Sequence, residues 1–530
     1  MRPTQWPSFL GLALLLALSL VPGQGRAVAQ PASPALDDAL DRAQAAQNNA
    51  HYADAATAYA TATKLSPRIP ELWANRGLME HLSKQPEAAI ASFHQALALR
   101  PGLFTPILFT GVDLVAVNKP EQALSFLHKA LSAQPKNPDA TLALARAYAA
   151  LHQLRPAANA YQAAAAVDPH SSSAWYGLAV ASLGLIEQDG GALASRHGDS
   201  VWARMLYADE LLAQSRLKEG THLYQEASRE TTPEDRAKFL RVLDTTADSA
   251  TSTSSSALSV DTLATLRQSL QPTSSAGLCN SSNSSSGTSA CAFLSGDYAG
   301  SAELASVAIT RNPADIEALY WSVKANERRA TVAFDRFASL APQSPATFDL
   351  TGDLYRRRSL FAEARAEYAK ALATDPHDPA ALLGTAAAYL AESHSDDAIA
   401  TAKTGLADHP EDPRLNLITA EALVVQRHFA EAHPFLDRSF RHEPAVDARV
   451  HALLGQVAAD AGDTKSAIAE LRLGLSSDRD GSLHFQLYRL LRRIGDLAGA
   501  QQAEAGARAL QAQRLQHATT VVEEVQSSHN

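Results

Sequence analysis

The sequence predicts an all-α protein in which helix pairs stack into an α-α superhelix, as two arrays separated by a serine-rich linker. Three observations support this fold class. Aromatic residues make up only 6% of the chain and alanine is abundant, which favours closely packed helices over sheets. Prolines recur at one constant spacing in both halves of the chain. At 530 residues, the chain exceeds what one hydrophobic core usually supports, so it must be modular.

Residues 1–29 are expected to be a secretory signal peptide. Arg2 precedes an unbroken apolar or small run over residues 9–21, and an A-x-A cleavage motif ends at Ala29. The run is shorter than the roughly 20 residues that a membrane-spanning helix needs. The alternative is an uncleaved membrane anchor. We therefore expect an exported mature protein, periplasmic or secreted, with no integral membrane segment.

The N-terminal array is expected over residues 34–245 and consists of 34-residue units. Its prolines keep one register: Pro67, Pro101, Pro135 and Pro169. With proline set at position 32, small residues recur at positions 8, 20 and 27, and a large apolar residue at position 24. The second unit shows this with Gly77, Ala89, Phe93 and Ala96. Small residues allow close helix approach, the large residue fills the space between helices, and proline ends the second helix because it lacks an N–H.

Two intervals break the period in the same way. The intervals 169–198 and 313–342 are equal in length, and each is shorter than a full unit. A shift of 144 positions aligns the two stretches without a gap and pairs Tyr176 with Tyr320. We expect each stretch to be a unit with a shortened second helix.

The linker is expected over residues 246–291, where serine, threonine and glycine dominate. Such a composition cannot bury enough apolar surface to order itself. The chain's two cysteines, Cys279 and Cys291, lie close together in sequence at this end of the linker. Export favours a disulfide between them, whereas a metal site is less favoured because no CxxC spacing or nearby histidine accompanies them.

The C-terminal array is expected over residues 292–517. Its prolines return to the spacing of the first array: Pro342, Pro376, Pro410 and Pro444. Two further units follow, and the helix beyond Ala500 is rich in Gln, Glu and Arg, as expected of a capping helix that faces water. Residues 518–530 are expected to be a disordered tail.

The unit pattern resembles the tetratricopeptide repeat, whose signature is W-x2-L-G-x2-Y, then A-x3-F, A and P. In that family, residues at positions 2, 5, 9, 12 and 13 of the first helix line a concave surface that binds ligands. For the C-terminal array, the resemblance implies a groove lined by Asp349, Asp353, Arg356, Leu383, Ala387, Arg414, Leu417, Glu421, Arg449, Gln456 and Arg489. The same positions in the N-terminal array are more apolar and include Tyr176 and Val180. This mixture suits a peptide or an amphipathic helix.

The sequence shows no convincing catalytic or cofactor signature. It has no glycine-rich phosphate loop, no H-E-x-x-H and no G-x-S-x-G elbow, and its C-terminal histidines differ in repeat phase. A net charge of −10 argues against nucleic acid as a partner. We therefore expect a non-enzymatic scaffold without cofactor or metal, which binds protein partners through the concave faces. Some envelope proteins of this family support polysaccharide export or outer-membrane assembly, so a role in envelope assembly is one option.

Two alternatives belong to other functional classes. A glycan-binding or accessory module of a polysaccharide synthesis or export system would use exposed aromatic rings, for which Trp175, Trp202 and Trp321 are the candidates. An enzyme is the third alternative.

Overall fold

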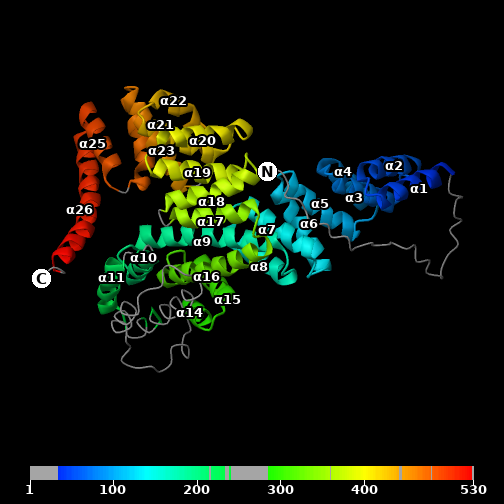
Figure 1. Ribbon diagram of the computed structural model, residues 1–530, viewed down its shortest axis with the longest axis horizontal. Coiled ribbons are helices and arrows are strands. Elements are labelled where there is room, and N and C mark those ends of the chain that lie inside the picture. The colour runs from blue at the N-terminus through cyan, green and yellow to red at the C-terminus, as the bar shows by residue number, and fades with distance from the viewer. Residues whose placement is uncertain are drawn as a thin grey trace. The chain divides into compact units, whose positions relative to one another are not determined.

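The computed structural model describes residues 34–213, 217–232, 235, 238–239, 285–357, 360–440, 444–478 and 480–527. This part of the chain is built of helices and turns, with no strand in it (Figure 1). It forms two compact units, Met1–Ala133 and Gln134–Asn530. The expected signal peptide and residues 246–284 of the expected linker lie outside the described residues. No described helix is long and apolar enough to cross a membrane.

The first unit contains three antiparallel helix pairs. They are α1 (Pro34–Asn48) with α2 (Tyr52–Leu65), α3 (Pro70–Leu82) with α4 (Pro86–Leu99), and α5 (Phe104–Ala116) with α6 (Pro120–Ala133). The predicted packing positions form the core, as Ala89, Phe93 and Ala96 are fully buried. A Cβ atom added to Gly77 would lie 2.6 Å from the ring of Phe93, so position 8 must stay small. The predicted roles of positions 8, 20, 24 and 27 are confirmed here.

The prolines at position 32 act together with the side chain at position 4 of the next unit. The indole Nε1 of Trp73 donates to the carbonyl oxygen of Pro67 at 2.9 Å, and Trp175 donates to Pro169 at the same distance. Proline thus ends one helix, and the next helix satisfies its exposed carbonyl.

The turn inside each helix pair also recurs at one position. Position 15 adopts a left-handed backbone with φ between 55° and 66° at Ala50, Lys84, Asn118, His152, Ser393 and Arg427. This conformation satisfies the last carbonyls of the first helix and reverses the chain.

The second unit continues the pattern with longer exceptions. Its helices are α7 (Pro138–Ala150), α8 (Leu154–Val167), α9 (Ser172–His197), α10 (Val201–Ala213), α11 (Leu217–Glu230), α14 (Ser285–Leu294), α15 (Tyr298–Arg311), α16 (Ile316–Leu340), α17 (Pro345–Arg357), α18 (Phe361–Thr374), α19 (Pro379–Ala391), α20 (Ser395–Asp408), α21 (Pro413–Val425), α22 (Phe429–Asp437), α23 (Pro444–Asp460), α24 (Thr464–Gly474), the short 3-10 helix η1 (Leu475–Ser477), α25 (Ser482–Ile494) and α26 (Leu497–Ser527).

The prediction of two units with shortened second helices was wrong. Each of the two short intervals is a single long helix, α9 of 26 residues and α16 of 25 residues. Helix α9 runs through Gly190 and Gly191, and neither a proline nor a left-handed residue interrupts it. The two long helices lie side by side over much of their length (Figure 1).

The first half of α9 takes its second helix from the far side of the linker. Tyr176 of α9 contacts Phe337 of α16, with ring centroids 5.2 Å apart. Leu178 and Ala333 are buried in one cluster with residues of α8. The first half of α9 and the second half of α16 therefore form one repeat, although the whole linker separates them in the chain.

The other halves form a matching repeat. Leu193 of α9 and Tyr320 of α16 share a buried cluster, and Ser322 Oγ donates to Asp189 Oδ2 at 2.6 Å. A shift of 144 positions aligns Leu193 with Phe337 and Tyr176 with Tyr320. The pair Tyr320 and Leu193 in the second composite repeat therefore corresponds to the pair Tyr176 and Phe337 in the first. The long helices thus exchange partners in a pseudo-symmetric way.

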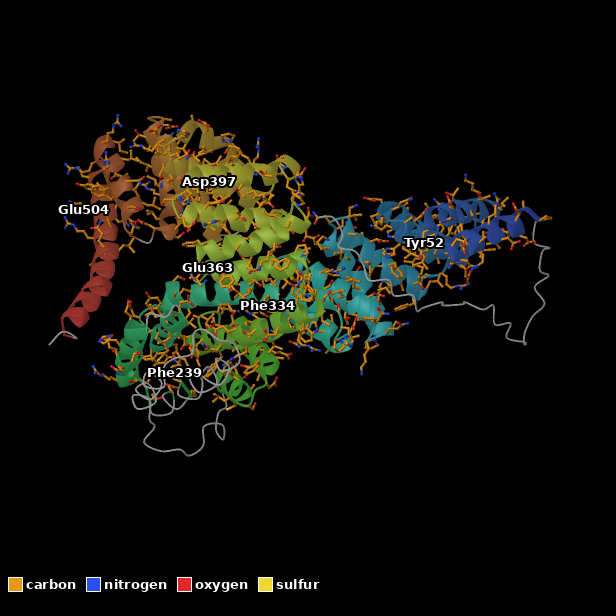
Figure 2. The ribbon with its side chains drawn as sticks, in the orientation of Figure 1. Tyr52, Phe239, Phe334, Glu363, Asp397 and Glu504 are labelled. Carbon is orange, nitrogen blue, oxygen red and sulfur yellow. The ribbon has the colours of Figure 1, made fainter. Side chains whose placement is uncertain are left out.

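The helices between α9 and α16 form a side branch of the second unit. Helices α10, α11, α14 and α15 pack around the second composite repeat and bury large rings, including those of Tyr224, Phe239, Phe293 and Trp321 (Figure 2 labels Phe239). The packing therefore differs from the expected division into arrays at 34–245 and 292–517, because elements from both sides of the linker share one core.

Two predicted boundaries also require correction. The end of the expected linker is helical from Ser285, because Ser289 and Ala290 of α14 are buried and Ser289 Oγ donates to the carbonyl of Ser301 at 2.8 Å. The expected disordered tail at 518–530 is helical up to Ser527, since neither glycine nor proline follows Gly506 to interrupt α26.

Candidate functional site

The candidate site is the inner face of the second unit, which we define as the surface of the first helices of its repeats: α7, α9, α17, α19, α21 and α23. Successive first helices contact one another, as α7 with α9, α17 with α19, α19 with α21 and α21 with α23. The second helices α18 and α20 do not approach each other to the same extent. The first helices therefore form the inner side of the curve, and the second helices form the outer side. Glu363 of α18 and Asp397 of α20 are exposed residues of these second helices (Figure 2 labels both).

Three predicted groove residues lie together on α17. The guanidinium Nη2 of Arg356 is 3.1 Å from Asp353 Oδ1, and the hydroxyl of Tyr368 donates to the same oxygen at 2.8 Å. Asp353 is therefore held in place by one residue of its own helix and one residue of α18.

A second pair of predicted groove residues forms a bridge between repeats. Arg449 Nε of α23 donates to Glu421 Oε1 of α21 at 2.7 Å. Arg414 is exposed and lies 3.2 Å from Asp412, the residue that caps the start of α21. The four other predicted apolar or amide positions are half-buried, and they are Leu383, Ala387, Leu417 and Gln456. Arg489 is exposed on α25.

Asp349 is the least satisfied of the predicted groove residues. Asp349 is only 7% exposed, and its Oδ1 atom is buried without a hydrogen-bond partner. Burial, followed by the negative charges of Asp378 and Asp353, raises the pKa of this carboxyl to about 8. Asp349 is therefore mostly protonated at neutral pH.

Tyr176 of α9 faces this group of carboxyls. Burial, followed by the charges of Asp349, Asp378 and Asp353, raises the pKa of its phenol to about 12. The sequence places Tyr176 and Asp349 in grooves of different arrays, each at position 5 of its unit. The structure brings them together on one inner face. The alignment of the two short intervals was the only sequence signal of the exchange of helices that makes them neighbours.

The tryptophans and histidines do not form an alternative site. Trp321 is fully buried, and Trp202 packs against Phe239 and Tyr320 with ring centroids 4.8 and 5.1 Å apart. Two rings that a glycan site would need are thus part of the core. Nδ1 of His451 lies 2.6 Å from Glu470, and within the described part of the chain no three His, Cys, Asp or Glu side chains converge as metal ligands would.

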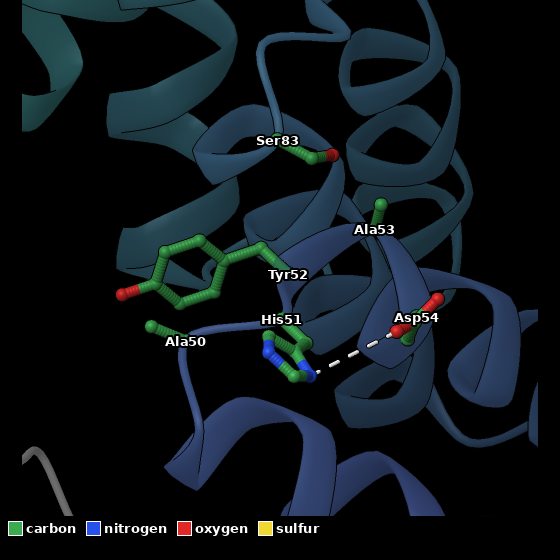
Figure 3. A pocket seen from close by; sticks show the side chains of 6 residues that line it. All are labelled: Ala50, His51, Tyr52, Ala53, Asp54 and Ser83. Atoms are coloured by element: carbon green, nitrogen blue, oxygen red, sulfur yellow. Dashed lines mark ion pairs between the residues drawn. The ribbon is translucent and has the colours of Figure 1, made fainter.

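A shallow pocket of about 380 Å³ lies in the first unit, at the turn between α1 and α2 (Figure 3). It is lined by Ala50, His51, Tyr52, Ala53, Asp54 and Ser83. The imidazole of His51 is 4.0 Å from Asp54, and both side chains are exposed. This pair is a solvated surface contact, without the converging polar groups of a ligand site.

Only one of the two cysteines of the predicted disulfide lies among the described residues. Cys291 of α14 is disulfide-bonded. Cys279 lies outside the described residues, so the pairing of the two cysteines stays a prediction.

Comparison with protein families identifies the repeats. One family model, described as tetratricopeptide repeat, matches residues 114–183 and 358–422. A second model with the same description matches residues 40–103 and 419–482. The matched segments come from both units and from both sides of the linker. The comparison with curated proteins gave no match.

Several solved structures are similar to parts of the chain. A MamA fragment from Desulfovibrio magneticus RS-1 is 20% identical, with 28% of this chain and 85% of that chain covered and a TM-score of 0.27. A chain of the APC/C hetero-tetramer Cut9–Hcn1 is 14% identical, with 90% of this chain and 87% of that chain covered and a TM-score of 0.31. YrrB, described as a TPR protein with an unusual peptide-binding site, is 18% identical, with 36% and 98% covered and a TM-score of 0.29. Similarities at this level carry no information about function.

Proposed function

Because the chain belongs to the tetratricopeptide repeat family, we propose that it is a scaffold that binds protein partners along the inner face of its second unit. The observation that most supports this function is the packing of α9 against α16, where the ring centroids of Tyr176 and Phe337 lie 5.2 Å apart, since it joins the inner surfaces of two predicted arrays into one. The joined surface carries apolar patches beside ordered charges, a combination that suits an extended peptide or an amphipathic helix.

We also propose that the protein is exported and takes part in assembly of the cell envelope. This proposal is supported by the expected signal peptide over residues 1–29 and by the two cysteines, which suit an oxidising compartment. Expression with the native leader, followed by fractionation and N-terminal sequencing, tests it. We expect a mature chain that begins at Gln30 outside the cytoplasm; a cytoplasmic chain that retains Met1 would refute export.

Affinity capture from an envelope extract tests the binding function. The inner-face variant Arg414→Glu/Arg449→Glu is compared with the outer-face variant Glu363→Lys/Asp397→Lys, since each changes two exposed side chains by charge reversal. We expect defined proteins on the wild type and the outer-face variant, and their loss from the inner-face variant. Equal capture by both variants would exclude the inner face. Recovery of polysaccharide alone would favour the glycan-binding alternative.

A further inference from the structure

We propose that the inner face holds a subsite for one lysine or arginine side chain of a protein partner, formed by Tyr176, Asp349, Asp353 and Asp378. This inference rests on the proposed function and specifies the partner's chemistry at one point. It follows from an uncompensated group of carboxylates and from a related position elsewhere in the same chain, where a lysine occupies the corresponding place.

The carboxylates come from α17 and from the start of α19. Asp378 caps α19, where its Oδ1 accepts from the backbone N–H groups of Ala380 and Ala381 at 2.9 and 3.3 Å. Arg356 pairs with Asp353 and offsets only one of the three acids. Within the described part of the chain, Asp349 has neither an ion pair nor a hydrogen bond at its buried Oδ1. A buried carboxyl without a partner is costly, so the arrangement is complete only when a donor reaches it.

The pseudo-symmetric branch contains the same arrangement of acid and tyrosine. A shift of 144 positions converts Asp353 to Asp209 and Tyr368 to Tyr224. The hydroxyl of Tyr224 donates to Asp209 Oδ1, just as that of Tyr368 donates to Asp353 Oδ1. The two sites therefore share their geometry as well as their alignment.

Helix α16, which packs against this branch, supplies the cation for Asp209. Lys324 of α16 is 4% exposed, and its Nζ lies 3.0 Å from Asp209 Oδ2. On the inner face, the residue aligned with Lys324 is Val180 of α9, which is 43% exposed. In one copy the ammonium of Lys324 pairs with Asp209; in the other copy Asp353 pairs with Arg356, and a solvent-exposed valine at the position of Lys324 leaves Asp349 and Asp378 without a cation among the described residues. A cationic side chain from a partner would take the place that Lys324 takes in the branch.

Binding at this subsite should release a proton. A cation beside Asp349 stabilises its ionised form and lowers a pKa that burial and the neighbouring acids raise to about 8. Affinity should therefore rise with pH below 8, by up to about tenfold per pH unit for one released proton. The titratable groups that act on Asp349 are Asp378 at the start of α19 and Asp353 on α17, and Asp349 in turn acts on Tyr176 of α9. Asp353 is itself bound by Arg356 of α17 and Tyr368 of α18.

The first test needs no partner. Val180→Lys should supply the missing cation from α9, as Lys324 does from α16, and Val180→Met is the uncharged control of similar length. We expect a higher melting temperature for Val180→Lys than for Val180→Met at pH 8, and a much smaller difference between them in an Asp349→Asn/Asp353→Asn background. Equal melting temperatures at pH 8, or an unchanged difference in that background, would overturn the subsite.

The second test uses octa-arginine as the probe and the full mature chain, with fluorescence anisotropy between pH 6 and 8. Wild type should bind more tightly as the pH rises, while Asp349→Asn should lose this pH dependence and Val180→Lys should bind at least about tenfold more weakly at pH 8. Glu363→Gln, an outer-face change, should behave as wild type, and octa-citrulline should not bind. Wild-type behaviour in both inner-face variants would overturn the subsite, while envelope proteins captured on the inner face would still support the scaffold.

Discussion

The hydrogen bond between Ser322 and Asp189 offers a direct measure of how strongly α16 is coupled to α9. The two side chains lie 2.6 Å apart and each residue is 2% exposed. Arg155 of α8 lies 2.5 Å from the other oxygen of Asp189, so this carboxylate joins three helices. A buried hydrogen bond to a charged group contributes about 1.5–3 kcal/mol.

A double-mutant cycle isolates this contribution. Ser322→Ala removes the hydroxyl, and Asp189→Asn removes the charge while it keeps the shape. We expect a coupling free energy of about 1–2 kcal/mol between the two changes, measured from urea unfolding of the four proteins by circular dichroism. Ser339→Ala is the control, because this exposed serine lies on α16 and donates only to the local carbonyl of Arg336. Additivity within about 0.5 kcal/mol for Asp189 with Ser322, as expected for Asp189 with Ser339, would refute the pairing of the long helices.

Three further predictions concern single positions. Gly177→Ala should lower the free energy of unfolding by about 1–3 kcal/mol, because the new Cβ would lie 2.2 Å from the ring of Tyr161. Gly191→Ala on the same helix should raise the free energy of unfolding by about 0.5–1 kcal/mol, because the new Cβ meets nothing within 4 Å. Because the pKa of Asp349 is raised in the folded state, its contribution to stability is complete below pH 4 and is lost as the pH rises towards about 8. The free energy of unfolding of wild type should therefore fall by up to about 1.4 kcal/mol per pH unit relative to that of Asp349→Asn, as urea unfolding at pH 5 and pH 8 would reveal. Lys84 has φ of 61°, so the melting temperature should rise in Lys84→Gly and fall in Lys84→Val, and the reverse order would exclude the left-handed turn.

Much of the repeat architecture could be predicted from sequence because its causes are local. Proline ends each second helix, small residues allow close approach, and both act within a single repeat unit. The exchange between α9 and α16 could not be predicted in the same way. Its contacts join residues such as Asp189 and Ser322, which are 133 positions apart, and the period gives no reason to look beyond the next helix.

The parts of the candidate site that depend on position within one repeat could be predicted from sequence, and the parts that depend on the exchange of helices could not. Positions within the repeat identified Asp349, Asp353 and Arg356, and the structure brings these three together on α17. The role of Tyr176 depends on the exchange of helices, so repeat position alone did not reveal it. Nor could sequence show that Asp349 has no partner, since that depends on which side chains the fold brings near it.

Cleavage of the linker tests most directly whether helices from both sides of it form one unit. A specific protease site replaces residues 251–256, which lie before both cysteines, so that no disulfide between Cys279 and Cys291 can bridge the cut. After cleavage, the shared core of α9 and α16 should keep the two fragments together through gel filtration, and only denaturant should separate them. Two fragments that elute apart, each still helical by circular dichroism, would contradict the composite repeats and restore two independent arrays.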